Sequence, residues 1–213
     1  MKSIFDLESP LIGALTKIGD CICLSVLWLV FSLPIITLGA SSTALYSAVH
    51  HCLGRGEAGI WKKFRSAFQE NFKRSTLSWL PLLAMILFLV YDVVALRALI
   101  QNGNPLGRLF GVILVLILVA GVWAMFLAAY CARFQGTVKD MLRFSFYLTM
   151  AHPLRSLGVL VAIWGSAALI LTVPGLAALL PAVAFWISSI LIEQVFMLHL
   201  RPENAEKKKE EDE

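Results

Sequence analysis

The sequence predicts an all-α fold, a polytopic integral membrane helical bundle, and three observations support this prediction. Hydrophobic residues make up 59% of the 213 residues, and charged residues make up only 15%, against about 25% in average soluble domains. A domain of this size cannot bury so much apolar surface in one core, so the bilayer must solvate much of it. Five apolar stretches have about 20 residues each, the length at which a helix crosses the hydrocarbon layer.

The five predicted transmembrane helices cover residues 18–39, 77–96, 109–132, 157–173 and 176–198. Residues 1–200 are therefore expected to form a single membrane-embedded helical domain, with two basic loops at 54–76 and 133–156. The last residues, 201–213, are charged and nearly free of apolar side chains, so they cannot order themselves by burial. We expect them to form a disordered tail.

The distribution of Lys and Arg predicts the orientation of the chain. Fourteen of the 18 basic residues lie in the two loops and the tail. Because short cytoplasmic loops are rich in Lys and Arg, the loops and the C-terminus are predicted to be cytoplasmic. The uncharged connection at 173–175 fits a tight external turn. We therefore expect a multi-pass protein of the cell membrane.

The first apolar run contains a break at Pro34 and Gly39, followed by the hydroxyl residues Ser41, Ser42 and Thr43. These hydroxyl groups can satisfy backbone groups freed by a break, provided that protein surrounds them. One span followed by a partly buried helix gives five spans and an external N-terminus. Two short helices would give six spans and an internal N-terminus, but the run has too few residues for two full spans and a turn. The break is either a packing hinge or part of a cavity.

Both basic loops contain a segment with the period of an amphipathic helix. In the first, aromatic residues recur every three or four positions, and basic residues occupy much of the remainder. This pattern is typical of a helix in the headgroup plane, although a helix packed on the end of its own bundle would also show it. The residues expected to contact lipid or a partner are Trp61, Lys62, Lys63, Phe64, Arg65, Phe68, Phe72, Lys73 and Arg74. The second segment, VKDMLRFSFYLTMAHPLRS, leads into the fourth span.

Three acidic residues, Asp20, Asp92 and Glu193, lie inside predicted spans. A charge at the bilayer centre costs about 2.5–3.5 kcal/mol unless it is paired or hydrated, so such residues are the first functional candidates. Lys17, three residues before Asp20, accounts for Asp20 as a local ion pair. Glu193 and Asp92 therefore form the candidate intramembrane polar site, able to bind a cation, relay a proton or hydrogen bond to another helix.

The sequence contains no catalytic motif of a known enzyme class. It has no Walker loop, no GxSxG and no dinucleotide fingerprint, so we expect neither an enzyme nor a cofactor. The histidines, His50, His51, His152 and His199, lack the spacing of a metal site. The basic residues flank apolar runs rather than forming one continuous patch, which argues against nucleic acid as a partner. The four cysteines lack a CxxC pair and are expected to be reduced.

Three segments together resemble the YesL family of bacterial integral membrane proteins, a family of uncharacterised function. The segments are FDLESPL, LPIITLGASSTALY and the basic aromatic stretch that ends in FQENFK. The resemblance covers nearly the whole chain and implies no catalytic residues. Such proteins are often encoded near carbohydrate uptake and degradation systems, so the resemblance implies a link to sugar transport.

These observations predict a non-enzymatic membrane protein, an accessory or scaffold component linked to carbohydrate uptake. Its expected partners are the lipid bilayer and a carbohydrate ABC transporter or another membrane protein. The alternative is a small transporter or channel that uses Glu193, Asp92 and the broken helix around Pro34, since transporters often bind substrates at discontinuous helices.

Overall fold

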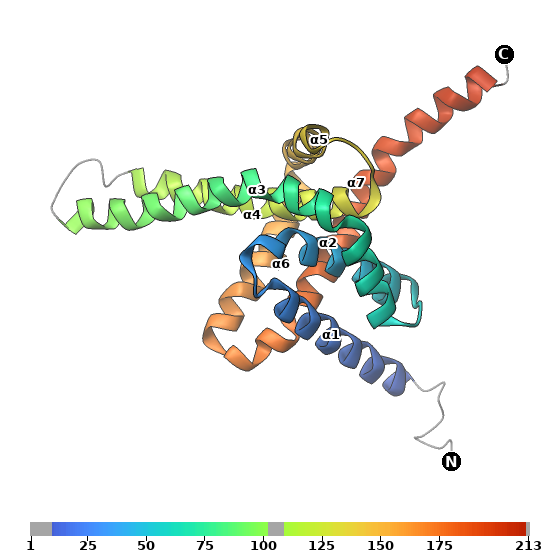
Figure 1. Cartoon of the computed structure of the whole chain (residues 1–213), viewed down its shortest axis with the longest axis horizontal. Helices are drawn as coiled ribbons and strands as arrows, with labels where there is room; N and C mark the ends of the chain where they lie inside the picture. The colour runs from blue at the N-terminus through green and yellow to red at the C-terminus, as the bar shows by residue number, and fades with distance from the viewer. Residues whose placement is uncertain (1–9, 102–108, 212–213) are drawn as a thin grey trace.

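A computed structural model describes residues 10–101 and 109–211, with side chains for residues 13, 15–100 and 109–198. The described residues are helical with no strand, as predicted, and five helices are long and apolar enough to cross a membrane. These five are α1 (Pro10–Ser32), α3 (Ile60–Gln101), α4 (Phe110–Arg133), α6 (Pro153–Thr172) and α7 (Leu180–Glu211). Two shorter helices, α2 (Leu38–Val49) and α5 (Val138–Ala151), complete the bundle (Figure 1).

The predicted break in the first apolar run is a sharp reversal between α1 and α2. Pro34 is extended, with φ −76° and ψ 115°, and a short 3₁₀ turn covers Ile35–Thr37. The Thr37 hydroxyl lies 2.6 Å from the carbonyl of Phe31 and 2.7 Å from that of Pro34, so it satisfies backbone acceptors that the break frees. The Ser32 and Ser41 hydroxyls, 2.7 Å apart, then join the two helices.

Helix α2 is buried on all sides, although it is only 12 residues long. It contacts α1, α3, α4 and α7, and its Tyr46 and Leu45 are among the largest fully buried side chains. Its hydroxyl residues satisfy themselves locally: Thr43 donates to the Gly39 carbonyl at 2.8 Å, and Ser41 to that of Leu38 at 3.1 Å. At 1.5 Å per residue the helix is about 18 Å long, too short to cross a hydrocarbon layer of about 30 Å.

Helices α1 and α7 are antiparallel. The Ser25 hydroxyl donates to the Leu179 carbonyl at 3.2 Å and accepts from the Ala182 amide at 3.0 Å. Earlier in α1, Lys17 lies 5.8 Å from the centroid of the Trp186 ring. The start of α1 and the later part of α7 therefore lie toward the same end of the bundle (Figure 1).

The segment 61–74, predicted as a helix of its own in the headgroup plane, is the first part of the 42-residue α3. No helix-breaking residue separates it from the second span, and Pro81, within that span, lies inside α3. The far part of α3 and the start of α4 leave the bundle together as a two-helix hairpin (Figure 1). We call residues 84–101 and 110–119 of this hairpin the arm.

The second amphipathic segment forms a separate helix, α5, and then continues into α6. The Thr137 hydroxyl caps α5 by accepting from the Asp140 amide at 3.3 Å. His152 separates α5 from α6, and Pro153 occupies the first turn of α6, where its missing N–H costs nothing.

Residues 201–211, for which the composition predicts disorder, continue α7 as a helix, and 212–213 lie outside the described residues. Alanine, glutamate and lysine all have high helix propensity, and Glu–Lys pairs four residues apart add further support. Helix formation in this segment therefore needs no burial.

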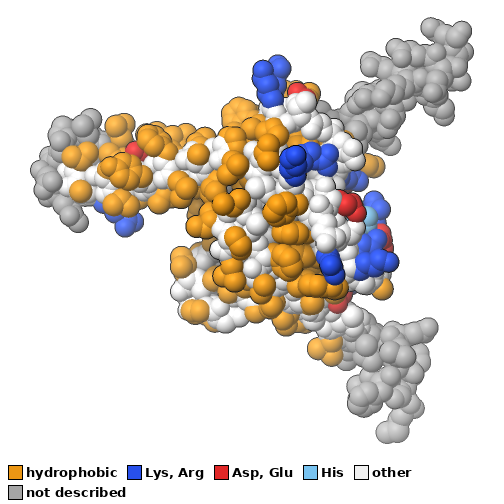
Figure 2. Space-filling view, viewed as in Figure 1, with side chains coloured by type: hydrophobic (Ala, Val, Ile, Leu, Met, Phe, Trp, Pro, Cys, Tyr) orange, Lys and Arg blue, Asp and Glu red, His pale blue; other side chains and the backbone are white. Residues whose placement is uncertain are grey.

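The charged side chains gather at one end of the molecule, whereas apolar side chains cover the arm and the middle of the bundle (Figure 2). The charged end comprises the α2–α3 connection, the end of α4 and the start of α5. Among the basic residues whose side chains the structure describes, Arg97 alone lies on the arm. This segregation is what a bilayer boundary across the bundle requires.

Candidate functional site

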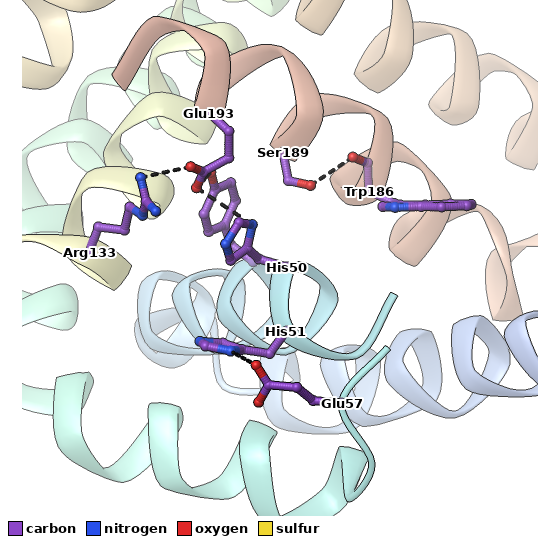
Figure 3. A network of polar contacts seen from close by, with 8 residues as sticks. His50, His51, Glu57, Arg133, Trp186, Ser189 and Glu193 are labelled. Atoms are coloured by element: carbon purple, nitrogen blue, oxygen red, sulfur yellow. Dashed lines mark hydrogen bonds and ion pairs between the residues drawn. The ribbon is translucent and has the colours of Figure 1, made fainter. Parts of the chain in front are cut away.

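Glu193 lies at the centre of a polar cluster at the charged end of the bundle (Figure 3). Its Oε2 is 2.7 Å from Nη1 of Arg133, and its Oε1 accepts a hydrogen bond from the Tyr46 hydroxyl at 3.2 Å. The Nδ1 of His50 lies 3.6 Å from the same Oε1. The side chain of Glu193 is only 17% exposed, so these contacts replace most of the hydration of its carboxylate.

Arg133 is the last residue of α4, where the negative end of the helix dipole favours a cation. Its guanidinium carbon also lies 5.9 Å from the centroid of the Phe196 ring, one turn beyond Glu193 on α7. The pair neutralises the charge of Glu193 and joins α4 to α7.

Tyr46 and His50 reach the cluster from α2 and from the π-helical turn that follows it, His50–Gly54. They lie one helical turn apart with their rings stacked at an interplanar angle of 3° and a centroid distance of 6.5 Å. Burial lowers the pKa of His50, an effect that the Glu193 carboxylate opposes and Arg133 reinforces. Burial, and then Glu193, raise the pKa of Tyr46 well above its usual value, which keeps the phenol protonated as a donor.

A second carboxylate, that of Glu57, lies in the α2–α3 connection beside this cluster (Figure 3). Its Oε1 lies 2.9 Å from Nδ1 of His51, and its Oε2 lies 2.5 Å from Nζ of Lys63. The hydrogen bonds from His51 and then Lys63 lower the pKa of Glu57 to about 2. The connection itself turns at Gly56 and Gly59, whose φ angles of 70° and 92° suit glycine.

The cluster has the chemistry of a structural ion pair. Both carboxylate oxygens of Glu193 are engaged, one by a guanidinium and one by a phenol. Within the described ranges, no group of three or more His, Cys, Asp or Glu residues could hold a metal ion. The arrangement therefore fixes the relative positions of α2, α4 and α7.

Asp92, the other half of the predicted intramembrane site, lies apart from Glu193. It is on the arm, partly exposed, whereas Glu193 is in the bundle. No described residue forms an ion pair or a side-chain hydrogen bond with the Asp92 carboxylate. The structure therefore does not bring the two predicted site residues together.

The predicted helix break packs closely against neighbouring helices. Trp28 Nε1 donates to the Ser42 hydroxyl at 3.2 Å, and Gly39 lies directly against the Trp79 indole of α3. A Cβ at residue 39 would overlap that ring. Glycine is thus required at position 39 by the close approach of α2 to α3.

The aromatic residues predicted to face lipid divide between two environments. Phe64 is completely buried and Phe68 is half-buried, and both pack edge-on against Phe31 of α1. Trp61 and Phe72 are 51% and 40% exposed. Most of the basic residues of this segment are exposed, namely Lys62, Arg65 and Lys73. The buried pair follows the second interpretation of the pattern, a helix packed on its own bundle.

Sequence reasoning missed Arg133 and Tyr46 as partners of Glu193. Arg133 was visible as a basic residue directly after an apolar run, and Tyr46 as a polar aromatic residue one turn before a histidine. Neither signal identifies Glu193 as the partner, since the three residues lie on helices far apart in sequence.

Comparison with known families gives one match. A family model described as "Protein of unknown function, DUF624" matches residues 21–93, about a third of the chain. The matched region covers the second half of α1, all of α2 and most of α3, including Gly39, Trp79 and Asp92. No curated protein and no solved structure matches the chain.

Proposed function

We propose that this protein is a non-enzymatic membrane scaffold whose arm packs against a transmembrane helix of another integral membrane protein. Asp92 is the observation that supports this proposal. It is an acidic residue on a hairpin with exposed apolar side chains, and no described residue pairs with it.

The arm offers a large apolar surface around Asp92. Exposed residues on its α3 strip include Phe88, Tyr91 and Val94, which are 64%, 69% and 64% exposed, and α4 adds Val112 and Val115. A carboxyl group among such side chains is costly in hydrocarbon unless a donor reaches it. A partner helix that carries a basic or hydroxyl side chain at the same depth would supply that donor and cover the apolar strip.

The partner class and orientation are finer parts of the same proposal. Family resemblance supports a membrane component of a carbohydrate uptake system as the partner. The positive-inside rule supports a cytoplasmic position for the charged end and for the C-terminus in the cell membrane. With α1 beginning at that end, the N-terminal end of α1 would face the cytoplasm as well.

The geometry gives less support to the alternative of a small transporter. Such a protein would need its intramembrane acidic groups along one pathway, yet Glu193 is paired with Arg133 in the bundle and Asp92 lies on the arm. The space beside the helix break near Pro34 is occupied by the packed side chains of Trp28 and Trp79.

Site-specific photocrosslinking in cells tests the scaffold function. A photoreactive residue at Tyr91 or Val94 should give one discrete crosslinked protein, and Asp92→Asn should reduce its yield. The matched control is Leu171 at the end of α6, which is 84% exposed but lies outside the arm and should not give that product. Deletion of the gene should also lower uptake of at least one sugar.

Equal crosslinking from Leu171 and the arm, or no product from the arm, would contradict docking through the arm. A crosslinked partner together with unchanged sugar uptake would retain the scaffold and remove the link to carbohydrate transport.

A further inference from the structure

A hollow of about 210 Å³ lies between α4, α5 and α6, at the level where α5 passes into α6. Its walls are almost entirely apolar and include Val119, Met150, Leu157 and Leu160. The hollow opens to the outside of the bundle, where Leu157 is 57% exposed and Met150 is 48% exposed. It has the lining that an acyl chain requires.

A second hollow, of about 420 Å³, adjoins the first and shares Pro153 with it. This one is lined by the residues that begin α6, including His152, Leu154 and Arg155, and by Leu198 of α7. The guanidinium of Arg155 forms no ion pair with any residue whose side chain the structure describes. An apolar slot thus adjoins a site that presents a cation.

The backbone at the start of α6 adds to this positive potential. The first i→i−4 bond of α6 runs from the Ser156 amide to the His152 carbonyl, at 2.9 Å. The amides of Leu154 and Arg155 precede it, and Pro153 has no N–H, so the positive end of the helix dipole is directed at the second hollow. Oxygens of a phosphate group would accept hydrogen bonds here.

The charge of the whole α5–α6 segment favours an anion. Residues 138–156 contain Lys139, Arg143 and Arg155 against a single acidic residue, Asp140. The Asp140 carboxylate is already engaged by the Thr137 hydroxyl at 2.6 Å. The segment therefore carries a net positive charge beside an apolar slot.

We propose that the two adjoining hollows form a binding site for an anionic phospholipid. One acyl chain lies in the slot between α4, α5 and α6, and the phosphate group contacts Arg155 and the first amides of α6. This site touches the arm only at Val119 and does not depend on docking through the arm.

Native mass spectrometry of the full-length protein in mild detergent tests this proposal. Phosphatidylglycerol and phosphatidylcholine with identical acyl chains are titrated against the protein. We expect phosphatidylglycerol to bind at least tenfold more tightly, and Arg155→Gln to weaken its binding about tenfold, as loss of a charge-assisted contact to phosphate predicts. The control Arg55→Gln, which removes a cation from the exposed α2–α3 connection, should leave binding unchanged.

A second variant tests the slot without disturbing the fold. Because Leu157 is largely exposed, Leu157→Trp should fold normally, fill the slot and reduce phosphatidylglycerol binding while leaving Arg155 in place. Circular dichroism and thermal unfolding verify that the variant is folded.

Three results would overturn the proposal. The first is equal binding of the two lipids. The second is an equal loss of phosphatidylglycerol binding in the Arg155→Gln and Arg55→Gln variants. The third is unchanged phosphatidylglycerol binding in a folded Leu157→Trp variant. Competition by inorganic phosphate as strong as that by the lipid would show a site for a free anion and would also contradict the acyl-chain slot.

Discussion

The guanidinium of Arg133 lies 2.7 Å from the carboxylate of Glu193, so the last residue of α4 is joined to α7 across the entire α5–α6 segment. The two side chains are 28% and 17% exposed, which limits screening of the pair by solvent. Each residue alone would be an uncompensated charge in a poorly hydrated site.

Removing one member of this pair should destabilise the protein more than removing both. We expect Glu193→Gln or Arg133→Met to cost about 1–3 kcal/mol, because each leaves the other group partly buried and unpaired. The double variant should cost less than either single variant, because it leaves no unpaired charge. Thermal unfolding in detergent measures the coupling, and additive effects would show that the pair does not act as a unit.

Gly39→Ala should destabilise the protein by about 1–3 kcal/mol, the usual cost of overpacking a core. The added Cβ would overlap the Trp79 indole, so α2 and α3 would have to separate. Trp79→Leu should restore part of the loss in the Gly39→Ala background. Gly111→Ala is the control, since a Cβ there meets no atom within 4 Å and alanine favours a helix. A loss of stability at Gly111 equal to that at Gly39 would contradict the packing explanation.

The α2–α3 connection should open at acid pH. The pKa of Glu57 is lowered from 4.5 to about 2 by its bonds to His51 and Lys63. Its stabilising contribution is therefore complete above about pH 4.5 and is lost as the pH falls toward 2. Hydrogen exchange of residues 54–60 should accelerate over this window, and Glu57→Gln should show fast exchange already at neutral pH. A Glu57→Gln variant with the wild-type pH profile would contradict this assignment.

Cysteine labelling should place the start of α1 and the α4–α5 connection on one side of the membrane. In a Cys23→Ser background, where the three remaining native cysteines are buried, single cysteines are introduced at Gly13, Gly136 and Gly175. A membrane-impermeant maleimide should label positions 13 and 136 from one side and position 175 from the other. Labelling of position 13 together with 175 would contradict the antiparallel arrangement of α1 and α7.

The fold class could be predicted because it depends on composition and on the lengths of apolar runs. A partly buried helix after Pro34 was also predicted, but its neighbours could not be, because a 12-residue segment rich in small and hydroxyl residues has no hydropathy signal of its own. The full extent of its burial is evident only in the structure, where Trp28 and Trp79 pack against it and its own Tyr46 extends from it.

The candidate site could be predicted only in part. Glu193 was identified from one local property, an acidic residue in an apolar run, and that property is independent of its partner. Its partners come from α2 and α4, so they depend on tertiary packing that no periodicity encodes. The position of Asp92 on the arm likewise depends on the point at which α3 leaves the bundle.

The position of α2 also has a consequence for biosynthesis. Its burial needs α1, α3, α4 and α7, and α7 is the last of these to leave the ribosome. Until then the serine and threonine side chains of α2 have no complete protein environment, and the helix is too short to remain in the bilayer as an independent span. Nascent chains that end before α7 should therefore be substrates for quality-control proteases, whereas chains that include α7 should be protected.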